Sequence, residues 1–266
     1  LPNAYSVVNP NRFDDKSNLQ YLCAAGVTFM FLVSLNRELR SKKWFKQNQI
    51  NEPYLINYLD LVSLGTVCDV VPLIGLNRAI VKQGLKILKS KKNLGLKTLL
   101  DICKIENTPS IYHLGFMLGP RINAGGRVGK CSHGANLLLD SNPKHVFKLA
   151  TELDQYNKER QILEKELLQK IMNETKDYSK DPVLVLSGKN WHEGVIGIVA
   201  ARLKDKFNKP VIIISIKNDI GKASARSIVG FDIGSIIIAA NQEKILLKGG
   251  GHKMAGGFSI KIENIN

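Results

Sequence analysis

Apolar residues recur at three- and four-residue steps through much of the first 120 residues, which is the spacing of amphipathic helices. Gly65 is expected to end one of these helices, and the lysines between Lys86 and Lys92 are interpreted as a solvated helix face. The opening segment, LPNAYSVVNPNRFDD, predicts a proline turn and a short apolar strand. The spacing predicts helices over residues 19–39, 52–65 and 78–92, and shorter helices around residues 95–103 and 110–118.

A long helix is predicted after Asn142, because Pro143 suits the first helical position and neither glycine nor proline follows before about Lys176. Its narrow apolar stripe can cover only part of a neighbouring surface. We therefore interpret residues 142–178 as a helix that connects two domains. The stripe consists of Leu149, Leu153, Tyr156, Leu163, Leu167 and Ile171.

Beyond residue 181 the pattern changes to strand, loop, helix and strand. VLVLSG and PVIIISI are continuous apolar runs of strand length, and the polar loop KNWHEG and the helix VIGIVAARLKDKF lie between them. This order predicts a small α/β domain over residues 179–266, after a first domain over residues 1–141. The predicted fold class is α/β.

Composition indicates a globular protein, since 266 residues with 44% apolar content can bury a sizeable core and form two domains. No apolar run reaches the 18 residues of a membrane span, and the longest run near the start lacks the basic flank and cleavage site expected of a secretory leader. The four cysteines are scattered without CxxC spacing, which argues against zinc and fits a reducing compartment. We expect a soluble, cytoplasmic protein that does not bind membranes.

The net charge of +15 indicates a polyanionic partner. Residues 1–150 carry 20 basic and 9 acidic side chains, and residues 182–266 carry 12 and 6, so two basic regions flank a nearly neutral connector. Such a surplus favours nucleic-acid binding through counterion release, although lysine-rich proteomes raise the charge without this purpose.

Three short stretches contain polar residues that packing explains poorly. In LGTVCDVVPL, Asp69 either caps the next element or serves a site. In GPRINAGGR, Arg121 and Arg127 are expected on a loop of small residues, either exposed or binding phosphate through their guanidinium forks. In NWHEG, His192 precedes a helix, and its ring either forms hydrogen bonds with the backbone or belongs to a functional site.

A fourth combination is stronger, because it brings charge, hydroxyl groups and exposed backbone together. GKASARS contains Ser224, Arg226 and Ser227, and GGGHKMAGG contains His252 after three consecutive glycines. We expect a glycine loop, from Gly249 to Gly251, whose N–H groups approach a phosphate beside His252.

These stretches, in this order, closely resemble the RecJ branch of the DHH phosphoesterase family, and the resemblance covers nearly the whole chain. It implies a single-stranded-DNA-specific exonuclease of DNA repair and recombination, acting 5′ to 3′, with helicase or single-strand-binding protein partners. It also implies the second part of a DHH-type α/β domain, a connecting helix and a DHH-associated domain.

The family uses a DHH motif and further aspartates to hold two Mn²⁺ or Mg²⁺ ions, and this sequence contains no DHH triplet. By the resemblance, Asp69 is the last metal ligand and the one catalytic residue present. One carboxylate cannot hold two ions, so the chain alone is expected to be inactive. The resemblance implies substrate-binding roles for Arg121, Asn123, Arg127, His192, Ser224, Arg226, Ser227, Gly249, Gly250, Gly251 and His252.

Three functions remain open at this point. The chain is part of an exonuclease whose catalytic half lies upstream, or a non-catalytic module that binds single-stranded nucleic acid, or a DHH-type phosphodiesterase for short oligonucleotides or cyclic dinucleotides. The RecJ-like stretches count against the third.

Overall fold

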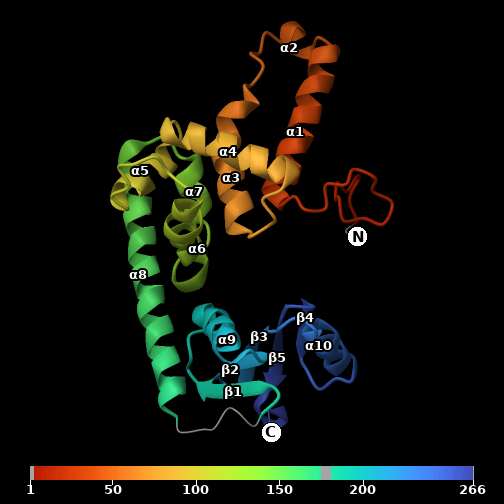
Figure 1. The fold of residues 1–266 in the computed structure, drawn as a ribbon, viewed down its shortest axis with the longest axis vertical. Coiled ribbons are helices and arrows are strands. Elements are labelled where there is room, and N and C mark those ends of the chain that lie inside the picture. The colour runs from red at the N-terminus through yellow and green to blue at the C-terminus, as the bar shows by residue number, and fades with distance from the viewer. Residues whose placement is uncertain (1–2, 175–180, 266) are drawn as a thin grey trace. The chain divides into compact units, whose positions relative to one another are not determined.

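The structure, a computed structural model, describes residues 3–174 and 181–265. The chain divides into two compact units. The first comprises Leu1–Asn123 and Ser132–Asp154, and the second comprises Ala124–Cys131 and Gln155–Asn266. Figure 1 shows the order of the elements along the chain. No helix in the described ranges combines the length and apolar character needed to cross a bilayer.

The first unit is helical, and no strand occurs among its described residues. Two further helices, α6 (Gly119–Val128) and α8 (Pro143–Asn173), begin in it and continue into the second unit. The helices of the first unit are α1 (Ala24–Ser41), α2 (Trp44–Gln47), η1 (Leu55–Tyr58), α3 (Leu59–Cys68), α4 (Gly75–Lys89), α5 (Leu94–Ile102), the π-helix η2 (His113–Leu118) and α7 (His133–Leu139).

The predicted opening strand is wrong for the residues that the structure describes. Residues 3–23 contain turns and bends, held locally by contacts such as the Arg12–Asp14 ion pair. A strand needs a partner for its backbone N–H and C=O groups, and the described part of this unit contains no other strand.

The prediction that Gly65 ends a helix is also wrong, because α3 continues through it to Cys68. A Cβ atom at Gly65 would lie 2.8 Å from the Cβ atom of Ala25 in α1. The glycine therefore allows two helices to approach closely. Packing rather than termination explains its place in the sequence.

Arg121 and Arg127 were expected on a loop, and this expectation is wrong because both lie in α6. The π-helix η2 runs directly into α6, so Pro120, which has no backbone N–H to donate, lies inside one continuous helical stretch. A Cβ atom at Gly119 would lie 2.4 Å from the Sγ atom of Cys68. The small residues of this stretch therefore serve helix packing as well as turns.

The predicted α/β fold class is confirmed by the five-stranded sheet of the second unit, which has the order β1-β2-β3-β5-β4. β1 and β2 are parallel, and the other neighbouring pairs are antiparallel. The segment from Gly249 to Gly251, expected as a loop, is part of a strand. The elements are β1 (Leu184–Lys189), α9 (Glu193–Phe207), β2 (Val211–Lys217), β3 (Ile220–Arg226), α10 (Ile233–Gln242), β4 (Lys248–His252), β5 (Ala255–Lys261) and η3 (Ile262–Asn264).

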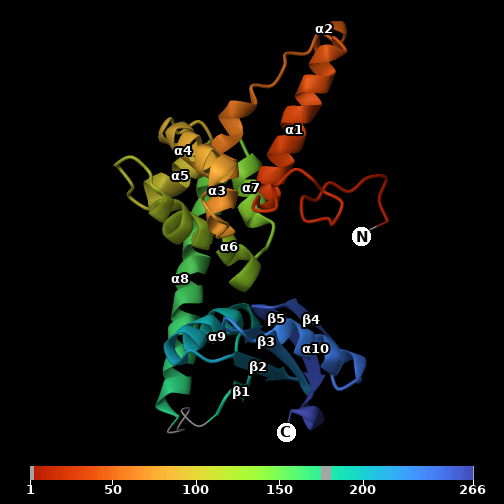
Figure 2. The same cartoon turned by 45° about the vertical axis from the view of Figure 1, so that its right-hand side comes forward.

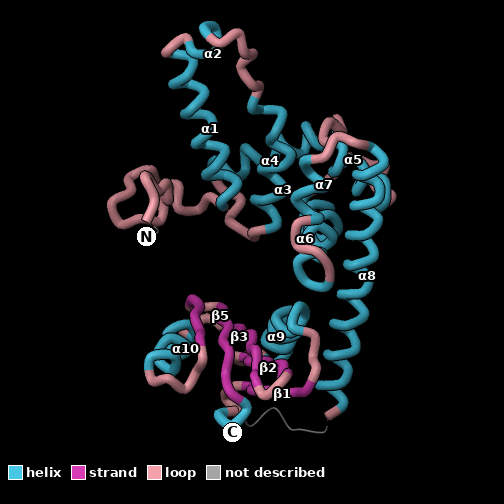
Figure 3. Tube along the Cα trace, turned by 180° about the vertical axis from the view of Figure 1, so that it is seen from behind, coloured by secondary structure: helices cyan, strands magenta, loops and turns pink. Residues whose placement is uncertain are grey.

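Helices cover the two faces of this sheet unequally. Val211 and Ile213 of β2 pack in one core with α9 and the end of α8, whereas Ile214 of β2 packs with α10 on the opposite face. Figures 2 and 3 show α9 beside β1, β2 and β3, and α10 beside β4 and β5. On the α9 face, β5 and β4 therefore lie beyond the strands that this helix covers.

The predicted connecting helix corresponds to α8, whose last described helical residue is Asn173. Its expected end near Lys176 and the domain boundary at residues 178 and 179 lie outside the described residues. The domain ranges 1–141, 142–178 and 179–266 therefore remain predictions.

Candidate nucleic-acid interface

The predicted site residues are distributed between the two units. Asp69, Arg121 and Asn123 belong to the first unit, and all the others belong to the second.

Asp69 is the exposed C-cap residue of α3. The described residues contain no group of three or more histidine, cysteine, aspartate or glutamate side chains arranged to hold a metal ion. A two-metal hydrolase needs several ligands for each ion in fixed geometry. The described residues therefore do not fit the Mn²⁺ or Mg²⁺ centre that the family resemblance implies.

The positive charge of Arg121 is compensated by a carboxylate of the first unit. Its Nε atom donates to Asp154 at 2.8 Å, its Nη1 atom donates to the carbonyl of Met117 at 2.8 Å, and both charged side chains are largely buried. Asn123, two residues later in α6, is exposed. Of these two, only Asn123 presents its side chain to solvent.

The strand register of the second unit gathers predicted residues on one face. Cross-strand partners share a face of the sheet, and this face is the one that α9 covers over β2 and β3. Across β3, β5 and β4, one row contains Arg226, Ala255 and His252, the next contains Ser224, Gly257 and Gly250, and a third contains Lys222, Ser259 and Lys248. A row without large side chains thus lies between two rows that carry cationic or imidazole groups.

Arg226 is half-buried beneath α9. A Cβ atom at Gly197 of α9 would lie 3.1 Å from Arg226 Nη2 and 2.8 Å from Ser224 Oγ. The guanidinium donates to the carbonyl of Ala225 at 2.8 Å, and no carboxylate among the described residues forms an ion pair with it. Burial and the nearby charge of Arg127 both lower the pKa of Arg226.

Arg127, in the last turn of α6, lies at the start of α9 and donates to the carbonyl of Gly194 at 3.1 Å. The pKa of Arg127 is lowered mainly by desolvation of its guanidinium, and the charge of Arg160 lowers it further. Arginine is not deprotonated in proteins, so these shifts report the loss of hydration first and neighbouring positive charge second, and a bound anion would offset both. The guanidinium borders a hollow of about 590 Å³ that His192, Ser215 and Lys217 also line.

His192 and His252 are held in the same way. The Nδ1 atom of His192 accepts from the N–H of Gly194 at 3.1 Å, which caps α9, and that of His252 accepts from the N–H of Met254 at 3.3 Å. An accepting Nδ1 assigns the proton of the neutral imidazole to Nε2. Both histidines are exposed and can therefore donate from Nε2 to an anion.

Ser227 differs from its neighbours because it is only 1% exposed. Its hydroxyl donates to the carbonyl of Phe231 at 2.6 Å and closes the turn before α10. Ser224 is partly exposed, and Arg226 Nη1 lies 3.4 Å from its hydroxyl. Ser227 therefore maintains the fold, whereas Ser224 lies on the face that carries Arg226.

The three consecutive glycines of β4 have different surroundings. A Cβ atom at Gly249 would meet Ile237 at 2.9 Å, and one at Gly251 would meet the carbonyl oxygen of Ala255 at 2.6 Å. A Cβ atom at Gly250 would have no heavy atom within 4 Å. Packing therefore requires the outer two glycines, whereas the glycine at 250 leaves the surface open for a close approach by a ligand.

Gly250→Ala is expected to leave stability unchanged or raise the free energy of unfolding by about 0.4–1 kcal/mol, since alanine restricts the unfolded chain. It should weaken binding of single-stranded DNA at least about tenfold, by about 1.4 kcal/mol, because the methyl group occupies the open surface. Thermal unfolding and fluorescence anisotropy measure the two effects.

The matched variant Gly251→Ala should instead destabilise the fold by about 1–3 kcal/mol, because its Cβ atom meets backbone atoms. If Gly250→Ala bound DNA as the wild type does, the open glycine would have no role in binding.

Sequence reasoning missed a group of charged residues around α8. It treated α8 as an apolar stripe with solvated charges, but Arg160 and Glu164 are only 12% and 5% exposed and form an ion pair. Their separation of four residues on a predicted helix was the available signal.

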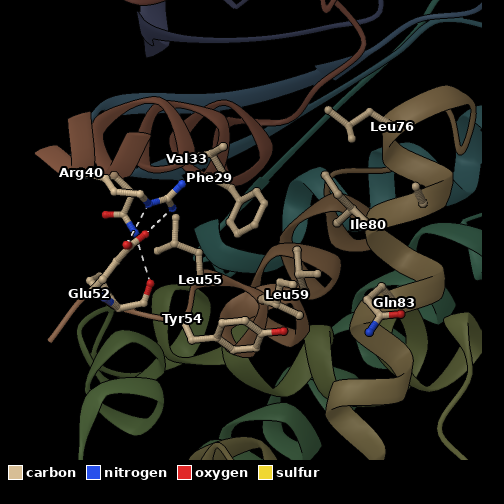
Figure 4. A pocket seen from close by; sticks show the side chains of 14 residues that line it. Phe29, Val33, Arg40, Glu52, Tyr54, Leu55, Leu59, Leu76, Ile80 and Gln83 are labelled. Carbon is tan, nitrogen blue, oxygen red and sulfur yellow. Dashed lines mark hydrogen bonds and ion pairs between the residues drawn. The ribbon is translucent and has the colours of Figure 1, made fainter. Parts of the chain in front are cut away.

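A second hollow, in the first unit, is apolar and occupies about 470 Å³. Figure 4 shows Phe29, Leu59 and Ile80 lining it, with the ion pair of Arg40 and Glu52 at one side. Arg40 has a carboxylate partner, so this hollow lacks the uncompensated cations of the second unit. Arg127 and Arg226 of the second unit, by contrast, have no carboxylate ion-pair partner among the described residues.

Residues 180–266 match the DHHA1 domain. The chain is 36% identical to the single-stranded-DNA-specific exonuclease RecJ of Escherichia coli over 271 residues, which cover 98% of this chain and 47% of that protein. It is 32% identical to the Bacillus subtilis protein of the same name, covering 100% of this chain and 32% of that protein. The chain thus spans about half or less of the length of these relatives.

Solved structures agree with the sequence matches. Thermus thermophilus RecJ in complex with Mg²⁺ superposes with a TM-score of 0.70 at 32% identity, covering 82% of this chain and 33% of that chain. A manganese-bound exonuclease RecJ gives a TM-score of 0.74 at 31% identity, covering 92% of this chain and 58% of that chain. Sequence and fold together assign the chain to the RecJ family.

Proposed function

We propose that this chain is the part of a single-stranded-DNA exonuclease that binds the phosphates of the substrate. The observation that carries this proposal is the pair of arginines formed by the exposed Arg127 and the half-buried Arg226, neither of which has a carboxylate ion-pair partner among the described residues. Uncompensated buried cations are unfavourable in the free protein, and phosphate oxygens would compensate them.

The groups around this pair suit a DNA strand. Guanidinium groups bind phosphate through two parallel hydrogen bonds, and the Nε2 atoms of His192 and His252 supply further donors. The row that contains Ser224, Gly257 and Gly250 carries no large side chain, so a strand can approach the backbone there. Arg121 is assigned a structural role instead, because Asp154 compensates it.

The catalytic half of the proposal rests on the relatives, which are named exonucleases. The described residues of this chain provide Asp69 but no cluster of ligands that could hold the metal ions. The 5′-to-3′ direction, the helicase or single-strand-binding protein partners and the cytoplasmic location remain predictions from the resemblance and the composition.

Binding of single-stranded DNA is expected to exceed binding of a matched duplex and to weaken steeply with salt. Each phosphate contact should contribute about −0.7 to the slope of log K against log salt concentration for a single strand. Anisotropy titrations at several chloride concentrations measure both quantities. Equal affinity for the two forms would contradict the proposal that this face binds a single strand.

A non-catalytic single-strand-binding module is the second candidate, and the lack of a metal-ligand cluster among the described residues favours it. The two candidates predict the same binding by the chain alone. They differ in a longer protein that also contains the remaining length of the RecJ relatives, which degrades DNA only if the first candidate is correct.

A further inference from the structure

Glu164 is a buried carboxylate shared between two helices of the second unit. Its side chain is 5% exposed, and Arg160 Nη1 donates to its Oε2 atom at 2.6 Å. Its other oxygen, Oε1, forms an ion pair with Arg202 of α9. One negative charge thus serves one arginine from α8 and one from α9.

Arg160 has few donors left for a ligand. Its Nε and Nη2 atoms donate to the Oδ1 atom of Asn157 at 3.3 and 3.1 Å, and Asn157 is itself buried. Every nitrogen of this guanidinium therefore has a partner on α8. The side chain is 12% exposed, so it is held away from solvent as well as neutralised.

Arg127 lies near this group without joining it. The charge of Arg160 lowers the pKa of Arg127, and the charge of Glu164 raises it. Arg226 is in turn affected by the charge of Arg127. The charge of Glu164 therefore partly offsets, at Arg127, the positive charge that Arg160 contributes.

We propose that Glu164 is a positioning residue of the anion site. By engaging Arg160 and Arg202 it reserves those cations for contacts within the protein, and it leaves Arg127 and Arg226 as the guanidinium groups that face the ligand. The identity of that ligand as a DNA phosphate rests on the proposed function, whereas the arrangement of charges does not.

Glu164→Gln tests this role, because the amide has nearly the same size and lacks the charge. Arg160 or Arg202 should become available to phosphates, so the slope of log K against log salt concentration for single-stranded DNA should steepen by about 0.7–1.4, one or two contacts. Glu166→Gln removes the same charge from an exposed position of α8 and should leave the slope unchanged. A purely structural residue would lower stability and affinity without a steeper slope.

Loss of the buried carboxylate could also prevent folding, so Arg202→Gln provides a second test at a side chain that is 60% exposed. Glu164 would then be shared by fewer cations and would reduce the potential at Arg127 more strongly. Binding of inorganic phosphate, measured as the thermal shift beyond that of chloride at equal ionic strength, should weaken severalfold. Lys206→Gln, at an exposed cation of the same helix, should change it little.

The two variants should therefore change phosphate binding in opposite directions, stronger for Glu164→Gln and weaker for Arg202→Gln. If Arg202→Gln matched Lys206→Gln, or if a folded Glu164→Gln matched Glu166→Gln, the positioning role would be wrong. If the wild-type chain failed to bind single-stranded DNA, the proposed function would fail, but the phosphate titration would still decide the role of Glu164.

Discussion

End-labelled single-stranded DNA is expected to remain intact when it is incubated with the 266-residue chain and millimolar manganese. Two-metal hydrolysis depends on ions that activate water and neutralise developing charge, and each ion needs several ligands. Asp69 is exposed at the end of α3, and the described residues provide no cluster that could complete a site. The rate should fall by more than about 10²–10³-fold relative to a full-length RecJ relative, since the loss of a single electrostatic contact already costs that much.

The control is a longer protein that joins this chain to the remaining length of its RecJ relatives. That protein should degrade the strand, and Asp69→Ala within it should abolish the activity. Degradation by the 266-residue chain, absent from its Asp69→Ala variant, would show that Asp69 has metal-ligand partners that we have not identified.

Arg226→Ala should weaken binding of 5′-phosphorylated single-stranded DNA by about 1.5–3 kcal/mol, or about 10- to 150-fold. The removed contact is a charge-assisted hydrogen bond from a half-buried guanidinium. Stability should stay constant or increase slightly, because the variant no longer buries an uncompensated cation. Anisotropy and thermal unfolding on the same samples measure these opposite effects.

Lys222→Ala is the matched control, since Lys222 lies four residues away on the same face but forms an ion pair with Glu193 at 2.7 Å. It should weaken binding much less than Arg226→Ala. Equal losses for the two variants would mean that only total charge matters. A loss for Arg226→Ala that is identical with and without the 5′-phosphate would assign Arg226 to the general DNA backbone.

The sequence pattern was sufficient to predict those elements whose structure depends on residues close to them in sequence. The apolar runs at β1 and β2, the amphipathic stripe of α8 and the polar loop before α9 all appear as predicted. The order of short motifs also identified the family. These features depend on periodicity, capping and turn chemistry, which a single sequence displays directly.

Glycine-rich stretches were the main source of error, because glycine has two uses that look alike in sequence. In α6 and at Gly65 it allows helices to pack closely, and in β4 it allows a strand to pack against α10. A loop that needs conformational freedom has the same composition. Only the neighbouring elements, which are distant in sequence, distinguish these cases.

By itself, therefore, the sequence determined the α/β class, the strand–helix–strand order that opens the second unit, the basic charge and a set of candidate phosphate-binding residues. The tertiary structure decided which of those residues are free to do so. Arg121 forms an ion pair with Asp154, which lies 33 positions away in sequence. Arg226, in contrast, is half-buried and has no carboxylate ion-pair partner among the described residues. Charge compensation and Cβ clearance depend on distances across strands and helices, and those distances are fixed only when the elements pack.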